Sequence, residues 1–208
     1  MNKNVTENVV YRYTPENSPE IRYRATPSLC TGAADTLAEA RAAYRADLTE
    51  LLHVERRELP PVIEHVETVV HGMWVREKVG AVHRDHNADR MFLQTLLAHG
   101  EAQAELRAYL DRACGVGVEP VVVLTEPEDT VGSVLNQMTP RDAVLVAYSD
   151  PDRDVGWAAI YGPEAEAAVD VPRVSTDPQL CRLPVVALAD RYARMRVESL
   201  PYAAGSAA

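Results

Sequence analysis

Large aromatic side chains and cysteines are scarce in this sequence. The 208 residues include one Phe and two Trp, so extensive aromatic surfaces for stacking a ligand are not expected. The three cysteines, Cys30, Cys114 and Cys181, are widely spaced and odd in number. This pattern excludes a disulfide framework, and no two cysteines have the spacing of metal ligands. A reducing compartment, and therefore a cytoplasmic location, is expected.

Long apolar runs are also missing. No stretch approaches the roughly 18–20 apolar residues that a helix needs to cross a bilayer. The N-terminal segment MNKNVTENVV lacks the apolar core of a secretory signal peptide. The sequence therefore predicts a protein without a membrane partner.

Basic residues are outnumbered by acidic ones. The net charge is −10, from 21 Lys and Arg against 31 Asp and Glu. Residues 1–83 carry 10 basic and 12 acidic residues, a net of −2, and residues 84–208 carry 11 and 19, a net of −8. A protein that grips phosphates is expected to carry a basic face, so nucleic acid is an unlikely partner. The acidic balance suits a basic protein partner, and it also fits an ordinary soluble protein.

Residue patterns in the first half predict an antiparallel sheet with one packed helix. Thr36 and Glu39 have the spacing of a capping box, and the apolar stripe that follows continues to Leu52. Pro60 and Pro61 mark the end of this helical region. The expected elements are a tail at 1–8, strands at 9–13 and 21–25, a loop at 26–35, the capped helix, and extended chain at 62–79 with a turn or bulge at 71–72.

The second half is predicted to contain an α/β unit. A buried type of strand, a short helix and another apolar strand follow one another within about thirty residues, the order of a βαβ element with parallel strands. The expected elements are helices between 87 and 114, strands at 118–124, 143–148 and 155–161, a helix at 128–138, a short helix from 162, and helical spacing at 185–195. The fold class is thus α+β, with an N-terminal domain at 1–83 and a helical connector and acidic α/β domain at 84–208.

The segment PSLCTGAADTLAEA, at 27–40, resembles the HicB-like antitoxin family. The resemblance covers about residues 9–80. It implies a domain that binds and masks a small basic RNA-cleaving toxin. The family often adds a C-terminal DNA-binding motif, and residues 84–208 show none. One departure is that Leu29 stands where the family usually has a glycine before the cysteine. The matching residues are Pro27, Leu29, Cys30, Gly32, Asp35, Thr36, Glu39 and Ala40.

Several groups of polar residues contain residue types that can carry chemistry. His83, Asp85, His86 and Asp89 include metal-binding residue types, but their spacing matches no known zinc motif and suits a polar helix start equally well. Asp150, Asp152 and Asp154 imitate half of a calcium loop, but Val155 and Tyr161 replace its required Gly and Glu. The remaining candidates are His65 and His71, which more often have structural roles in strands, and the acidic connection TEPED at 125–129, which would repel phosphate. No catalytic residue, metal site or cofactor is predicted.

We therefore expect an antitoxin-like interaction module that binds and neutralises a basic protein. The predicted partner-binding residues are Arg22, Arg24, Cys30 and Thr36. The alternative is a small-ligand sensor or an enzyme of unknown reaction, built on the C-terminal α/β unit. Ligands in such units gather at the carboxyl ends of parallel strands, which here points to Thr125, Glu126, Asp150 and Asp152. A homo-oligomer and a purely structural role also remain open.

Overall fold

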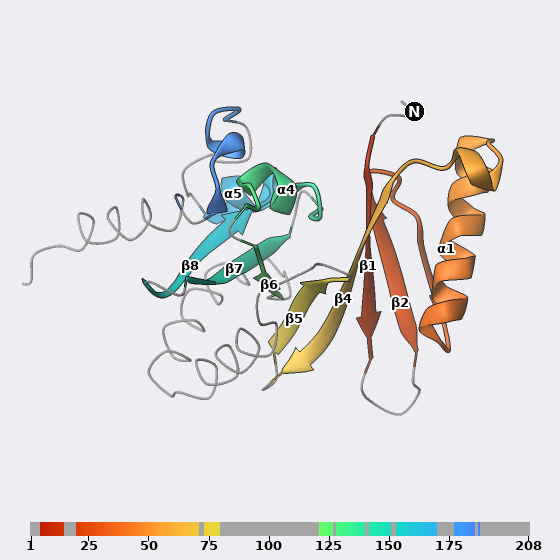
Figure 1. The fold of residues 1–208 in the computed structure, drawn as a ribbon, viewed down its shortest axis with the longest axis horizontal. Helices are drawn as coiled ribbons and strands as arrows, with labels where there is room; N and C mark the ends of the chain where they lie inside the picture. Colours follow the sequence, from red (N-terminus) through yellow and green to blue (C-terminus); the bar gives the residue numbers. More distant parts are fainter. Residues whose placement is uncertain are drawn as a thin grey trace, which may run out of the picture.

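One mixed sheet of eight strands runs through both halves of the chain, in the order β3-β2-β1-β4-β5-β6-β7-β8 (Figure 1). The computed structural model describes residues 5–14, 20–70, 73–79, 121–126, 128–139, 142–150, 153–169, 177–185 and 187. The strands are β1 (Glu7–Tyr13), β2 (Ile21–Thr26), β3 (Thr31–Ala34), β4 (Val62–Val70), β5 (Met73–Lys78), β6 (Val121–Leu124), β7 (Ala143–Asp150) and β8 (Arg153–Tyr161). The helices are α1 (Leu37–Leu52), η1 (Arg56–Glu58), α4 (Val131–Leu135), α5 (Pro163–Val169) and η2 (Leu180–Arg182). The α+β fold class is confirmed.

The first half forms a four-strand unit with α1 on one face. β1 pairs antiparallel with β2 and parallel with β4, and β2 pairs antiparallel with β3. The predicted capping box is present, since Thr36 accepts from the Glu39 amide and Glu39 binds the Thr36 amide in return. The buried helix residues Ala40, Tyr44 and Leu48 recur at intervals of four, as one apolar stripe requires.

Two details of the first half differ from expectation. β3 lies inside the segment predicted as a loop, because pairing with β2 stabilises four residues, TGAA, that have little strand propensity of their own. The first strand also begins earlier than expected, inside the segment predicted as a tail. Glu7 and Asn8 belong to β1 and are buried, at 0% and 6% exposure, because parallel pairing with β4 extends over both residues.

The second half contains the predicted βαβ element. β6 and β7 are parallel, and α4 lies between them in the chain. The helix is shorter than predicted, with five residues after the Thr130 cap. β8 returns antiparallel to β7, and α5 follows it, as expected from Gly162 and Pro163.

The sheet continues across the predicted domain boundary. β4 and β5 are antiparallel, and β5 pairs in parallel with β6 from the second half. The boundary itself, the helices expected at 87–114 and most of the segment at 185–195 lie outside the described residues, so the two-domain division stays a prediction.

Residues on the sheet alternate between two faces, and each face has its own apolar cluster. On the first face, Val9, Tyr11 and Tyr23 pack against Tyr44 and Leu48 of α1. On the opposite face, the second cluster consists of apolar residues of β6, α4 and β8 together with Met138 and Val185: Val121, Val123, Val131, Val134, Met138, Ile160 and Val185. Trp74 belongs to this second face, next to Arg12, which stacks over its ring. The helices α1 and α4 therefore cover opposite faces of the sheet.

Candidate functional site

All four predicted partner-binding residues lie next to β3 in the chain or in the sheet, and Arg24 is paired with Thr31. Cys30 immediately precedes this strand, and Thr36 caps the helix that follows it. Arg22 pairs with Ala33 of β3 in the register, and its side chain is 66% exposed beside Glu20. Arg24 is different, because it forms an ion pair with Asp142, Nη2 to Oδ2 3.0 Å. Its charge is therefore engaged within the molecule.

β3 is an edge strand, since among the described residues it pairs with β2 alone. The amide of Ala25 donates to the Cys30 carbonyl at 2.8 Å. This bond determines which residues of β3 are hydrogen-bonded to β2 and which are not. Backbone groups of successive residues point alternately toward and away from the neighbouring strand. The N–H and C=O groups of Thr31 and Ala33 therefore point away from β2, and both residues are exposed.

The two sides of α1 differ in charge. Glu39, Ala43, Asp47 and Glu50 fall at intervals of four, four and three, which places them on one stripe of the helix. Asp47 accepts from the Tyr23 hydroxyl of β2, so this acidic stripe lies toward β2 and β3.

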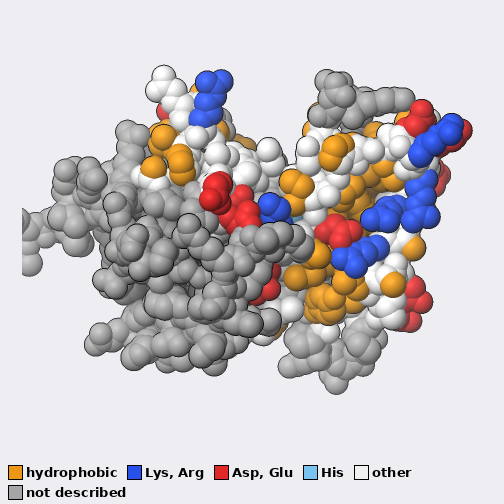
Figure 2. Space-filling view, viewed as in Figure 1, with side chains coloured by type: hydrophobic (Ala, Val, Ile, Leu, Met, Phe, Trp, Pro, Cys, Tyr) orange, Lys and Arg blue, Asp and Glu red, His pale blue; other side chains and the backbone are white. Residues whose placement is uncertain are grey.

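The basic residues of α1 occupy its other side. Arg41 and Arg45 approach Glu64 of β4, with shortest N–O distances of 2.6 and 3.9 Å. Figure 2 shows basic and acidic side chains interspersed over the half of the molecule that carries α1. β3 and β4 stand at opposite ends of the order β3-β2-β1-β4, so these arginines lie away from β3. The α1 side of the β3 edge is therefore acidic, whereas the exposed Arg22 lies on the other face of the sheet.

The turn between β2 and β3 displays an apolar residue on an unfavourable backbone. Leu29 has a φ of 61°, in the left-handed region that favours glycine, and 69% of the residue is exposed. A leucine there carries a conformational cost that its limited burial does little to offset. This is the position at which the HicB-like pattern usually has glycine.

The opposite face of the sheet contains a buried ion cluster that sequence reasoning missed. Glu67 of β4 lies 2.7 Å from Nη2 of Arg76 on β5 and 2.6 Å from Nε of Arg12 on β1. The Glu67 and Arg76 side chains are completely buried. Arg76 also donates to the Gln137 carbonyl at 3.2 Å, which ties β5 to the segment after α4. The only sequence signal was the alternation of charged and apolar residues along Val-rich strands, and it does not say which charges meet.

Electrostatics keeps this cluster charged. Burial would raise the pKa of Glu67, but Arg76 and Arg12 bring it below its ordinary value. Burial lowers the pKa of Arg76, and Glu67 opposes that effect. For Asp142, burial is likewise outweighed by Arg24 and by hydrogen bonds from Thr139, so its pKa is lowered. These groups fit a structural network within the fold.

His65 lies next to the ion cluster and is held neutral. It is 3% exposed, and its Nε2 lies 3.4 Å from Oδ1 of Asn8. Burial, with the positive charges of Arg76 and Lys78, lowers its pKa to about 3, although Glu67 acts in the other direction. A histidine so far from its ordinary range is a poor general base at neutral pH. Its predicted companion His71 lies outside the described residues.

A second group of buried polar atoms lies on the α1 side. Oε1 of Glu7 and the hydroxyls of Tyr11 and Tyr44 are buried without a hydrogen-bond partner among the described residues. The Ser28 amide donates to the other Glu7 oxygen at 3.4 Å. Burial raises the pKa of both tyrosines, which keeps their hydroxyls protonated.

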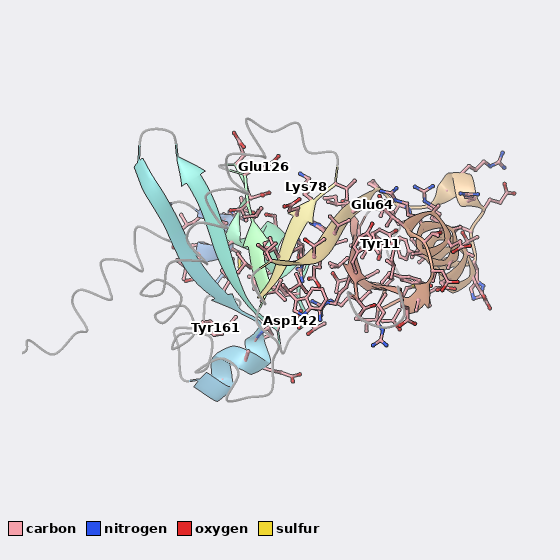
Figure 3. All side chains as sticks on the ribbon, turned by 90° about the horizontal axis from the view of Figure 1, so that it is seen from below. Tyr11, Glu64, Lys78, Glu126, Asp142 and Tyr161 are labelled. Carbon is pink, nitrogen blue, oxygen red and sulfur yellow. The ribbon has the colours of Figure 1, made fainter. Side chains whose placement is uncertain are left out.

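The predicted ligand site lies at the carboxyl ends of the parallel strands β5, β6 and β7. Thr125 and Glu126 directly follow β6, and Asp150 ends β7. Glu126 forms an ion pair with Lys78 at the end of β5, with Nζ and Oε2 3.5 Å apart. Figure 3 shows Lys78 and Glu126 together at one end of these strands and Asp142 at the other. Asp152 lies outside the described residues.

Metal-binding clusters and membrane-spanning helices are both absent from the residues that the structure describes. Among the residues that the structure describes, no group of three or more His, Cys, Asp or Glu could hold a metal ion. The cluster from His83 to Asp89 lies outside them. Within the same described ranges, no helix is long and apolar enough to span a membrane. Cys30 and Cys181 are free thiols, and burial raises the pKa of Cys30.

Comparisons with known proteins do not assign a family. No protein-family model matches the sequence. No curated protein and no solved structure shows a significant match. What the chain does must therefore be argued from its own residues.

Proposed function

We propose that this chain is an antitoxin-like interaction module that binds and neutralises a small basic protein in the cytoplasm. The observation that carries the proposal is the position of Arg22, Cys30 and Thr36 around the exposed edge strand β3. These residues are the ones that the resemblance to HicB-like antitoxins points to. Cys30 and Thr36 flank β3 in the chain, and Arg22 lies beside Ala33 on the sheet face opposite α1.

Two further features support the same function. Leu29 adopts the backbone conformation that glycine favours, at the position where the HicB-like pattern has glycine. The net charge of −10 would attract a basic partner and speed its association.

The test is co-purification from the native host. The tagged full-length chain is purified at its native expression level, and the bound proteins are identified by mass spectrometry. We expect a small basic protein in stoichiometric amount, encoded beside this gene. Co-expression of the two genes should then relieve the growth defect that the partner causes alone. If no neighbouring gene product binds or is neutralised, the proposal is wrong.

A second candidate function is a small-ligand sensor or enzyme at the carboxyl ends of β5, β6 and β7. The observation that favours it is the parallel arrangement of these strands. It places Thr125, Glu126 and Lys78 together at the carboxyl ends of β5 and β6. A thermal-shift screen with metal ions and metabolites tests it. A stabilising compound whose effect is lost in Lys78→Ala would support this candidate, and a screen without any hit would count against it.

A further inference from the structure

We propose that the open edge of β3 receives an extended segment of the basic partner, which pairs with β3 as an additional strand of the sheet. This inference rests on the proposed function, and it names the site and the mode of recognition. Neither follows from the resemblance, which concerns the residues of the turn and the helix start.

Backbone groups provide the first argument. The N–H and C=O groups of Thr31 and Ala33 point away from β2, and no described residue pairs with them. An edge of this kind is a template for another strand. Native sheets often protect such edges with lysine, proline, a bulge or a very short strand. The sequence TGAA contains no lysine or proline, and the length of four residues limits an added strand to a few backbone hydrogen bonds.

Side chains next to the edge define the chemistry of the incoming strand. Asp35 follows β3 directly, and Glu39 and Glu50 lie on the helix stripe that faces β2 and β3. All three are exposed, and this stripe carries no Lys or Arg. Lysine or arginine side chains on one face of an added strand would meet these carboxylates, whereas an acidic strand would be repelled.

Leu29 adds an apolar contact at the end of the edge. Four residues of β3 form too short an edge to select a partner through backbone bonds alone. The exposed leucine at the turn lies one residue before Cys30, where an incoming strand that runs past β3 can cover it. An exposed leucine on an unfavourable backbone fits a binding role.

The experiment uses the full chain, isotopically labelled, and a synthetic probe peptide in which lysine alternates with valine. We expect the amide resonances of residues 31–34 to shift on titration. Ala33→Pro removes one outward N–H, and it should weaken binding at least about tenfold. The matched control Ala33→Thr keeps that N–H and should stay within about twofold of the wild type.

Peptide variants provide a test that does not depend on folding of the protein variant. A peptide of the same pattern with glutamate in place of lysine should not bind. A lysine peptide that is N-methylated on the amides facing β3 should lose most of its affinity. The inference is overturned if the lysine peptide does not bind at millimolar concentration, if the glutamate peptide binds equally well, or if the shifts map away from β3. It is also overturned if a concentration-dependent homodimer disappears in Ala33→Pro, because a second copy then occupies the edge.

The antitoxin-like function and the strand pairing at β3 can be refuted independently of each other. If a neutralised partner co-purifies equally well with wild type and Ala33→Pro, the chain is an interaction module that uses another surface. If the wild type retains no partner in its host but the probe peptide binds at β3, the edge is a strand-binding site and the antitoxin function is wrong.

Discussion

Arg76 on β5 and Glu67 on β4 lie side by side on neighbouring strands and form a buried ion pair. Nη2 of Arg76 and Oε1 of Glu67 are 2.7 Å apart, and neither side chain is exposed. The pair lies on the face opposite α1, and Arg76 also reaches the Gln137 carbonyl. It therefore joins the strands of the first half to the segment that follows α4. Its burial makes the stability of the fold sensitive to the loss of either charge.

We expect Glu67→Ala to lower the free energy of unfolding by about 3–5 kcal/mol, because Arg76 then stays buried without a counter-charge. Replacing both residues with methionine should recover most of this loss, since the fully buried Arg76 charge is then removed and Arg12, the other partner of Glu67, is partly exposed to solvent. Urea unfolding monitored by circular dichroism measures both effects. A loss below about 1 kcal/mol in Glu67→Ala would contradict the buried pair.

Stability should also fall on acidification because of His65. The folded protein lowers the pKa of His65 to about 3, whereas the unfolded chain has the ordinary value of 6.5. Between these values the unfolded state binds the extra proton, so the free energy of unfolding rises with pH, by at most about 1.4 kcal/mol per pH unit. The contribution is complete above the unfolded pKa and is lost as the pH falls toward 3.

The variant His65→Gln isolates this contribution, because it keeps a polar partner for Asn8 and cannot titrate. Unfolding free energies measured between about pH 4.5 and 6.5 should rise less steeply in the variant than in the wild type. Glu67 and Asp142, whose pKa values are lowered, add a loss of stability at still lower pH in both proteins. Equal slopes in the two proteins would show that His65 titrates normally in the fold.

The backbone at Leu29 predicts an unusual ranking of substitutions. With a φ of 61°, Leu29→Gly should be more stable than Leu29→Ala by about 1 kcal/mol, the reverse of the usual order. Thermal unfolding of the two variants measures the difference. Both variants lose the exposed apolar side chain, so both should bind the lysine peptide more weakly than the wild type. A less stable glycine variant would contradict the left-handed conformation.

Arg24 and Asp142 provide a measurable link between the two halves of the chain. A double-mutant cycle with Arg24→Ala and Asp142→Ala should give a coupling energy of about 1 kcal/mol, because the ion pair is largely shielded from solvent. The single change at Asp142 should cost more than the change at Arg24, since Asp142 also accepts from Thr139.

Arg22→Ala is the matched control for this cycle. Arg22 lies on the same strand and the same face as Arg24, but its partner Glu20 is on the surface. We expect its loss to change stability by less than about 0.5 kcal/mol. A coupling of zero between Arg24 and Asp142 would mean that their contact does not hold the halves together.

Local patterns predicted the elements whose signals lie close together in the chain. The pair Thr36 and Glu39 predicted the start of α1. The helix was expected to end at Pro60 and Pro61, but it ends at Leu52, because His53 adopts the left-handed conformation that terminates a helix. Apolar runs predicted β6 and β7, and the helix between them predicted a parallel pair. β3 was missed because TGAA has no strand signal of its own, and α4 was overestimated because composition does not mark where a short helix unwinds.

The predicted partner residues show the same limit. Arg22 and Arg24 lie two residues apart on β2 and therefore on the same face of the strand, so the sequence does not distinguish them. In the structure, Arg24 meets Asp142, a residue 118 positions away, whereas Arg22 stays exposed. Which arginine remains available to a partner depends on a contact that no local pattern encodes.

The sequence by itself determined the α+β composition, the capped helix, the parallel βαβ pair and the acidic charge, because each depends on neighbouring residues or on simple counts. The tertiary structure decided that β3 is an edge, that Glu67 meets Arg76 and Arg12, and that His65 is buried beside them. These features arise from strand order and register, which are set by packing between residues far apart in the chain. Burial then acts on the charges so assembled and sets their pKa values, so the electrostatics of this protein belongs to its fold.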